Sequence, residues 1–341
     1  MQIDTVLSAP LATVGDQAED LARRGFDGAY TFENAHDVFF PLLEAARRTD
    51  LFLYSNVAIA FPRSPMHLAH AAWDLQSLSQ GRFALGLGSQ VKPHIERRYA
   101  ASWHAPIGRM REMIQAIKAV FACWQNQEPL DFHGDHYTLT LMTAAFDPGP
   151  LECGPPPIWA GAFGPQMTRM VAAHADGLVV HPFHTEGFLR DHTVPLMEEG
   201  FARAGRTRDG FVLGVDTIVC AGRDEAEIES AETGVRWLLA FYGSTPAYRP
   251  VLDHLGQGEL QPELNALSKQ GRWDEMAGLI EDDLITAIAL RGTPAEVAGQ
   301  IQDRYGDVAD RVALTFPYAA PSDLLGEILD QLPDQLPGRS G

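Results

Sequence analysis

The sequence predicts an α/β fold in which eight parallel strands, separated by helical chain, close into a (β/α)8 TIM barrel. First, apolar runs of four to twelve residues alternate with helical patterns along the chain. Second, the runs are apolar on both alternating faces, which is typical of strands buried on both sides of a parallel sheet. Third, eight such runs within 341 residues match a closed barrel.

An open, doubly wound sheet is the alternative architecture for such alternation. That fold binds phosphate at a glycine-rich turn after its first strand. The segment after the first apolar run, SAPLATVG (residues 8–15), lacks the required glycine spacing. The closed barrel is therefore favoured.

The expected strands follow one another at intervals that leave room for a helix after each. In chain order they are residues 5–8, 28–32, 51–61, 83–88, 157–162, 177–181, 211–222 and 311–316.

Three of the intervening helices carry clear signals. An apolar stripe over residues 14–22 ends in Arg-Arg-Gly at 23–25, and two cations with a glycine suit a helix C-terminus. Ser-Pro at 64–65 indicates a cap and first turn. Apolar residues at three- and four-residue steps predict a helix over 106–124.

Two segments exceed a minimal barrel and are expected as insertions after the fourth and seventh strands, within a single domain that spans residues 1–341. The first is about 125–156, where alternation around His133-Gly134-Asp135 predicts a hairpin. The second is about 241–280 and is expected to form irregular chain and short helices. We expect both insertions at the C-terminal rim, where they would shape a substrate site and a lid.

Composition excludes several classes of function. The net charge of −19 argues against nucleic-acid binding and against docking on anionic lipid. No apolar run approaches the roughly 20 residues of a membrane span, and the N-terminal segment does not resemble a signal peptide. Cys123, Cys153 and Cys220 lie too far apart for a disulfide framework. A soluble protein of a reducing cytoplasm, acting on a small molecule, is expected.

No metal site is expected. His181 and His184 follow the sixth strand, but isolated histidines are more often structural than metal ligands. The histidines share no ligand spacing with carboxylates, and zinc-protease, nucleophile-elbow and phosphate-loop motifs do not occur.

The active site of such a barrel lies at the C-terminal ends of its strands. After the second strand, residues 33–37 read Glu-Asn-Ala-His-Asp. Glu33 and His36 could exchange protons there, and an imidazole does so near neutral pH. The alternative is a helix cap at Asn34 or Asp37 beside a solvated histidine.

The fourth strand ends in Gly88-Ser89-Gln90, and His94 follows. Glycines at a strand end let a flat or charged ligand approach the backbone, and the polar residues supply donors. By itself this glycine signal is weak.

After the fifth strand, Gly161-Ala162-Phe163-Gly164 precedes Pro165 at the start of an expected helix. The first amides of a helix point outward and suit an anion, so this loop could bind a phosphate. A tight turn without ligand is the alternative interpretation.

Taken together, five segments resemble the bacterial-luciferase-like superfamily of flavin- and deazaflavin-dependent oxidoreductases. They are residues 25–49, 78–99, 106–121, 156–183 and 291–301. The resemblance spans nearly the whole chain, and its order agrees with the strand count. GSQVKPHIERR (residues 88–98) looks most like the branch that uses coenzyme F420, a deazaflavin.

This resemblance implies a barrel with an insertion and a cofactor ring in its mouth. It also implies a bulge with a non-proline cis peptide in the third strand, which alignment places at Ser55-Asn56. The cofactor contacts implied by the resemblance are Ser55, Asn56, Gly88, Ser89 and Gln90, with Gly161, Ala162, Phe163 and Gly164 at its phosphate.

The chain departs from the family pattern after the second strand. Many deazaflavin-dependent members carry Asp-His there, whereas this chain has Glu33-Asn34, with His36 two residues later. Asn34 is therefore expected beside the cofactor, and proton transfer is assigned to His36, with Glu33 or His94 as the alternatives.

The leading functional hypothesis is an F420-dependent oxidoreductase that transfers hydride between the reduced cofactor and an unknown small organic substrate. The close alternative is an FMN-dependent monooxygenase that uses molecular oxygen. A cofactor-free barrel acting on sugar phosphates and a non-catalytic flavin-binding protein are more distant alternatives. Lys92, Arg97 and Arg98 either meet the acidic tail of the coenzyme or are solvated. The resemblance also implies a homodimer.

Overall fold

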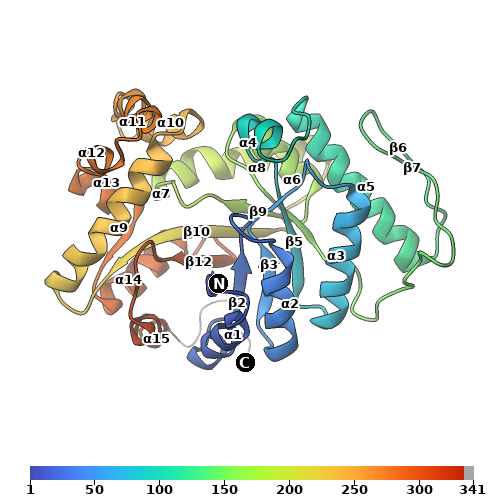
Figure 1. Cartoon of the computed structure of the whole chain (residues 1–341), viewed down its shortest axis with the longest axis horizontal. Helices are drawn as coiled ribbons and strands as arrows, with labels where there is room; N and C mark the ends of the chain where they lie inside the picture. The colour runs from blue at the N-terminus through green and yellow to red at the C-terminus, as the bar shows by residue number, and fades with distance from the viewer. Residues whose placement is uncertain (334–341) are drawn as a thin grey trace.

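The computed structural model describes residues 1–333, and within them eight parallel strands close into a barrel surrounded by helices (Figure 1). Each barrel strand pairs with the next in chain order, and the last pairs with the first. The predicted (β/α)8 fold is therefore confirmed. The barrel strands are β1 (Gln2–Val6), β2 (Gly28–Thr31), β3 (Phe52–Ser55), β5 (Phe83–Gly88), β8 (Ile158–Gly161), β9 (Gly177–Val180), β10 (Val212–Ala221) and β12 (Arg311–Thr315).

Two strands differ clearly from their predicted bounds, and one short strand was not predicted. The first strand begins at Gln2 and not at residue 5. The sequence pattern did not indicate its start, because the strand contains a buried carboxylate, Asp4. The run 51–61 is split into β3 and β4 (Ala58–Ile59), and the Asn56–Val57 peptide bond between them is cis. β10 also pairs with β11 (Leu290–Gly292), a short strand that hydrophobic patterning does not reveal.

The predicted helices are confirmed with their ends. The first helix closes at Gly25, whose φ of 92° is left-handed, as a glycine C-cap allows. The Ser64 side chain caps the third helix by accepting a hydrogen bond of 3.2 Å from the His67 amide. The helices that surround the barrel are α1 (Val14–Arg24), α2 (Phe39–Arg48), α3 (Pro65–Leu78), α4 (Lys92–Arg97), α5 (Pro106–Asn126), α6 (Pro165–His174), α7 (Glu186–Phe188), α8 (Val194–Ala204), α9 (Glu225–Gly243), α14 (Pro294–Tyr305) and α15 (Ser322–Asp330).

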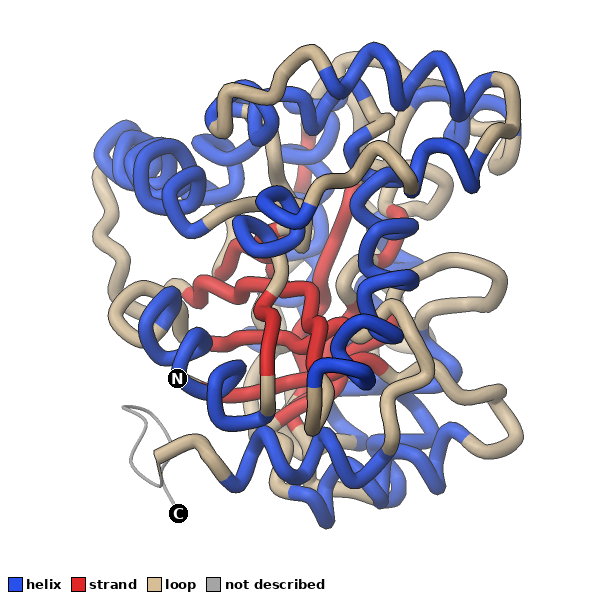
Figure 2. Tube along the Cα trace, turned by 90° about the vertical axis from the view of Figure 1, so that its left-hand side faces the viewer, coloured by secondary structure: helices blue, strands red, loops and turns tan. Residues whose placement is uncertain are grey.

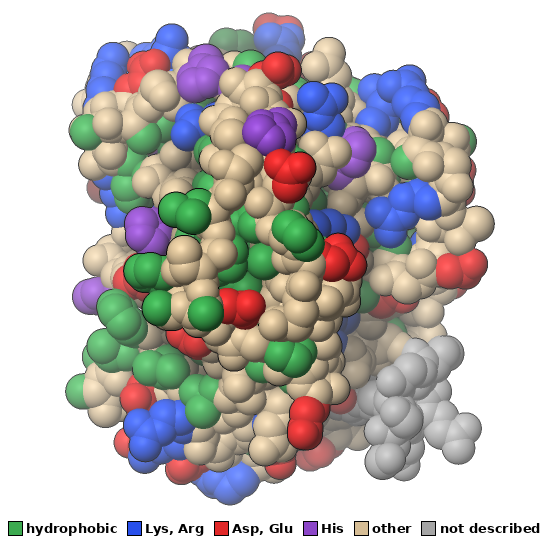
Figure 3. Space-filling view, turned by 90° about the vertical axis from the view of Figure 1, so that its right-hand side faces the viewer, with side chains coloured by type: hydrophobic (Ala, Val, Ile, Leu, Met, Phe, Trp, Pro, Cys, Tyr) green, Lys and Arg blue, Asp and Glu red, His purple; other side chains and the backbone are tan. Residues whose placement is uncertain are grey.

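The first insertion forms the predicted hairpin, from β6 (Phe132–His133) and β7 (Thr138–Leu139). It lies on the outer side of α5, at the right of Figure 1, where Glu112 accepts a hydrogen bond of 2.7 Å from the His136 amide. The hairpin also contacts the chain at the C-terminal side of the barrel: Arg109 donates hydrogen bonds to Tyr137 and to the Phe61 main-chain oxygen, and the His104 and His136 rings lie 5.3 Å apart. That this insertion shapes the substrate site stays a prediction. Figure 3 shows hydrophobic side chains gathered on this side of the molecule, and the insertion exposes Leu141 and Phe146.

The second insertion folds into short helices at the upper left of Figure 1. It packs on α9 and shares with it a separate core that includes Phe183, Leu252, Leu264 and Met276. The helices are α10 (Arg249–His254), α11 (Leu260–Lys269), α12 (Trp273–Ala277) and α13 (Asp282–Ile288).

The barrel interior is filled with side chains, and Figure 2 shows the strands gathered at the centre of the helices. Near the N-terminal ends of the strands, Arg311 holds Asp4 through two hydrogen bonds of 2.6 and 2.7 Å. Tyr54 donates a third to the same carboxylate at 3.1 Å. In residues 1–333, no helix combines the length and the apolar character that a membrane crossing requires.

Candidate functional site

Four polar side chains meet inside the barrel toward the C-terminal ends of β2, β3, β10 and β12. Asp216 accepts hydrogen bonds from Thr315 at 2.7 Å and from Tyr30 at 3.2 Å. The Asn56 amide stands 3.5 Å from the same carboxylate, and the Tyr30 and Thr315 hydroxyls are 2.9 Å apart. We call these four residues the floor cluster.

Asp216 is surrounded by neutral groups. It is 7% exposed, and within residues 1–333 no Lys or Arg forms an ion pair with it. Burial raises its pKa to about 7, against the lowering effect of the Thr315 and Tyr30 hydrogen bonds. A carboxyl with a pKa near neutrality can give or take a proton at the pH of a cell.

Sequence analysis did not identify Asp216 as a site residue. It lies within the apolar run 211–222, and our search covered only the residues after each strand. The available signal was a single carboxylate in the middle of an otherwise apolar strand, because an unpaired charge is costly to bury without a purpose.

Glu33 connects three segments at the mouth. Its carboxylate is 2.6 Å from Arg63 and accepts hydrogen bonds from the Ile59 amide at 2.8 Å and from Tyr99 at 3.1 Å. These contacts join the loop after β2 to the loop after β4 and to the chain after α4. Glu33 is thus occupied by three donors, and its proposed acid–base role stays a prediction.

The remaining polar residues of this side lie at the surface. His36 and His94 are exposed, and Asn34 receives a hydrogen bond from Arg98 at its main-chain oxygen. Arg98 is therefore engaged within the protein. The catalytic roles of His36 and His94 and the cofactor contact of Asn34 stay predictions.

Val57, the residue after the cis bond, packs against the ends of β5 and β8. A Cβ added to Gly88 would overlap its side chain, and a Cβ added to Gly161 would stand 3.4 Å from Val57 Cγ1. Ser55 exchanges hydrogen bonds of 2.8 and 3.0 Å with the Gly86 main chain. Glycine is needed at position 88 because Val57 packs there, and a cofactor contact with Gly88 remains a prediction.

The loop after β5 is shaped by its own polar side chains. Gln90 adopts a left-handed φ of 58°, and its side-chain oxygen accepts a hydrogen bond of 2.9 Å from the Val91 amide. The Ser89 hydroxyl donates to the Gln90 main-chain oxygen at 3.2 Å. Both residues are half-buried at the mouth, where sequence analysis expected them.

The N-terminus of α6 is open, as a phosphate site requires. Gly164 precedes the helix in extended conformation, Pro165 occupies the first turn, and no side chain caps the helix. A Cβ at Gly164 would meet no atom within 4 Å. The amides of the first turn are therefore without a side-chain cap, and there is open space beside Gly164 at the positive end of the helix dipole.

Aromatic side chains form the other side of the mouth: Phe163, His181, Tyr242 and Tyr248, which we call the aromatic wall. The His181 ring stacks on Tyr248 at 4.4 Å and meets the Tyr242 ring edge at 4.5 Å. Phe163 contacts Tyr248 edge-on at 4.8 Å. Tyr242 and Tyr248 come from the end of α9 and from the second insertion, so this insertion does reach the mouth.

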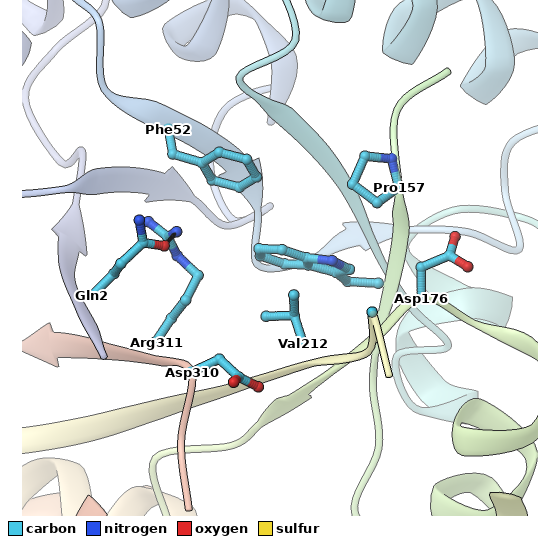
Figure 4. Close-up of a pocket in the computed structure, with 9 residues that line it drawn as sticks. Gln2, Phe52, Pro157, Asp176, Val212, Asp310 and Arg311 are labelled. Carbon is cyan, nitrogen blue, oxygen red and sulfur yellow. Dashed lines mark hydrogen bonds between the residues drawn. The ribbon is translucent and has the colours of Figure 1, made fainter. Parts of the chain in front are cut away.

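A pocket of about 390 Å³ lies at the opposite, N-terminal end of the barrel, lined by Phe52, Pro157 and Val212 among others (Figure 4). Its carboxylates are already engaged. Asp176 is 2.6 Å from Lys118, and Asp310 accepts a hydrogen bond of 2.7 Å from a main-chain amide. This end of a TIM barrel serves stability, so the site is placed at the other end.

The described residues contain no group of three or more His, Cys, Asp or Glu side chains that could hold a metal ion. Groups that could take part in chemistry at the mouth are the Asp216 carboxyl, the Tyr30 and Thr315 hydroxyls and the open N-terminus of α6.

Comparison with known proteins shows which family this chain belongs to. The family model described as "Luciferase-like monooxygenase" matches residues 2–311. An uncharacterized protein of Mycobacterium tuberculosis is 43% identical over 94% of each chain. A second M. tuberculosis protein, provisionally named a coenzyme F420-dependent oxidoreductase, is 29% identical and covers 81% of this chain and 83% of its own.

Among solved structures, the coenzyme F420 dependent tetrahydromethanopterin reductase from Methanopyrus kandleri superposes with a TM-score of 0.78. It is 19% identical and covers 97% of both chains, so this likeness establishes the fold.

Proposed function

The chain belongs to the luciferase-like monooxygenase family and is an oxidoreductase, and from this premise we propose that its cofactor is coenzyme F420. The observation that carries the proposal is the relative provisionally named an F420-dependent oxidoreductase, which is similar over 81% of this chain. When bound, the deazaflavin would supply hydride transfer to or from a small organic substrate.

The residues at the mouth fit such a cofactor. The open first turn of α6, entered through Gly161, Ala162, Phe163 and Gly164, suits its phosphate. Asn56, Ser89 and Gln90 would border its ring, with Ser55 fixing the bulge from behind.

Proton transfer is the task of the protein itself. We assign it to Asp216, because this carboxyl lies inside the mouth and its pKa of about 7 suits both donation and acceptance. Tyr30 and Thr315 hold the carboxyl in place. His36 is the alternative, since an exposed imidazole could reach the mouth from the loop after β2.

Equilibrium titration of the apo protein with F420 and, separately, with FMN tests the cofactor. We expect F420 to bind at least about tenfold more tightly than FMN. Preferential binding of FMN, together with oxygen consumption in the presence of a reductant, would instead support the FMN-dependent monooxygenase.

We also propose that the protein forms a homodimer, since the face with Leu141 and Phe146 exposes apolar surface. Light scattering of the purified protein measures this directly, and a monomeric mass would contradict it.

A further inference from the structure

The aromatic wall is water-accessible although it lies deep in the protein. Phe163, His181, Tyr242 and Tyr248 are all half-buried. At the same time, burial lowers the pKa of His181 to about 3 and raises that of Tyr248 to about 12. The wall is therefore uncharged at neutral pH and faces the mouth with apolar ring surface.

Two polar atoms of the wall have no partner within the protein. In residues 1–333 neither the Tyr242 nor the Tyr248 hydroxyl forms a hydrogen bond, although burial raises the pKa of both. The charge of Asp216 adds to the effect of burial in raising the pKa of Tyr242. Both hydroxyls are reached by solvent, so they are free to bind the oxygen of a ligand.

Cations are missing from this side of the mouth. The sequence has no Lys or Arg in residues 177–189, 212–222, 237–248 or 312–320, which supply the ends of β9, β10 and β12 and the end of α9. The next cation along the chain, Arg249, is 3.4 Å from Asp253 and 3.2 Å from Glu259. A phosphate or carboxylate on a substrate would find no counter-charge here.

From these observations we propose that the mouth selects an uncharged, ring-bearing substrate with one hydrogen-bonding oxygen. Its ring would lie against Tyr248 and His181, and its oxygen would face Tyr242 and Asp216. Offset or edge-on ring contacts provide the selectivity, and anions are rejected because they would lose their hydration without gaining a cation. This inference rests on the proposed function, because it concerns the substrate of the same site.

Two probes of the same shape test it: acetophenone, which is neutral, and 4-acetylbenzoate, which carries a carboxylate. Their dissociation constants are measured by ligand-observed NMR on protein saturated with F420. We expect acetophenone to bind at least about tenfold more tightly. Equal or tighter binding of 4-acetylbenzoate would overturn the proposal without any variant.

Variants then locate the selectivity. Tyr248→Ala should weaken acetophenone binding about fivefold or more, as expected for loss of a ring contact, whereas Tyr248→Phe should retain it within about twofold. Trp237→Ala is the matched control, since Trp237 lies on α9 but stacks outward on the exposed Phe241 at 5.7 Å. Unchanged affinity in Tyr248→Ala would contradict the proposed placement.

F420 affinity is measured on every variant by separate titration and should stay unchanged. Failure of F420 to bind any of them, wild type included, would contradict the proposed function and with it this inference. Normal F420 binding with no preference between the probes would contradict the substrate class alone.

Discussion

Two carboxylates lie inside the same barrel, and their surroundings differ. Asp4, toward the N-terminal end, is held by the Arg311 guanidinium at 2.6 Å and by Tyr54. Asp216, toward the C-terminal end, is bound within the described part of the chain by neutral hydroxyls and an amide. Asp4 thus has a fixed cation beside it, whereas burial without a cation raises the pKa of Asp216 to about 7, where a carboxyl can exchange protons. The ion pair at the N-terminal end therefore stabilises the barrel, whereas the carboxyl at the C-terminal end is available for proton transfer.

The largest expected effect is at the ion pair between Arg311 and Asp4. Arg311→Met leaves Asp4 buried without its cation, and breaking such a pair typically costs about 3–5 kcal/mol. We expect a loss of this size in the free energy of unfolding, measured by urea denaturation. Arg272→Met, which breaks an exposed pair with Glu275, is the control and should change little. Equal unfolding free energies of the two variants would contradict the proposal that the Asp4–Arg311 pair stabilises the barrel.

The pH dependence of stability sharpens the comparison. The folded-state pKa of Asp216, about 7, is raised above the usual value of 3.8. Its contribution is therefore fully present below pH 3.8 and is lost as the pH rises through 7, by roughly 4 kcal/mol at most. The unfolding free energy of wild type relative to Asp216→Asn should fall over this range. The low pKa values of His181 and His184 act with the opposite sign, but they cancel in the difference. A flat difference would contradict the raised pKa.

Measurements of turnover test the proposed role of Asp216 directly. Asp216→Asn should lower turnover about 10²-fold and remove the ionisation near pH 7 from the rate profile, because the amide cannot exchange a proton. F420 affinity should stay within about threefold, which separates proton transfer from cofactor binding. Full activity in this variant would exclude Asp216 from the reaction.

The exposed histidine after β2 should matter less. His36→Ala is expected to lower turnover by about tenfold or less, because the side chain is exposed and the carboxyl inside the mouth remains. If this variant instead lost about 10²-fold while Asp216→Asn remained active, the proton would be assigned to His36.

An effect of similar size is expected at the cofactor phosphate. Gly164→Asp places a carboxylate at the open start of α6, where it would occupy the free amides and repel phosphate. We expect F420 affinity to fall about tenfold, with helix stability unchanged or slightly higher. Gly164→Ala controls for loss of the glycine, and the dissociation constants come from fluorescence titration. Unchanged affinity in Gly164→Asp would exclude this helix end from the site.

The sequence predicts the fold well because strand burial and helix amphipathicity are local patterns. The capped start at Ser64 and the glycine end at Gly25 depend only on neighbouring residues. The first strand was misplaced by three residues because the cation that permits Asp4 to be buried lies 307 residues away. The predicted bulge was also confirmed close to its expected place, with the cis bond at Asn56–Val57.

The site was harder to predict because its groups meet only in three dimensions. The sequence does not indicate a partner for Glu33, but in the fold its carboxylate pairs with Arg63 and accepts a hydrogen bond from Tyr99. Asp216 appears to be part of an apolar strand, yet it is the carboxyl that faces Tyr30 and Thr315. The aromatic wall depends on the second insertion, whose packing has no simple periodic signal.

Strand β10 has a consequence for engineering. Leu213 and Val215 pack in the main core, whereas Ile218 and Cys220, on the same strand, belong to the core shared with the second insertion. Asp216 sits between the two pairs. Exchange of residues 244–288 to graft a new specificity would remove part of the core that Ile218 and Cys220 share with α9. The replacement must restore that packing, because Asp216 lies two residues from Ile218 on the same strand.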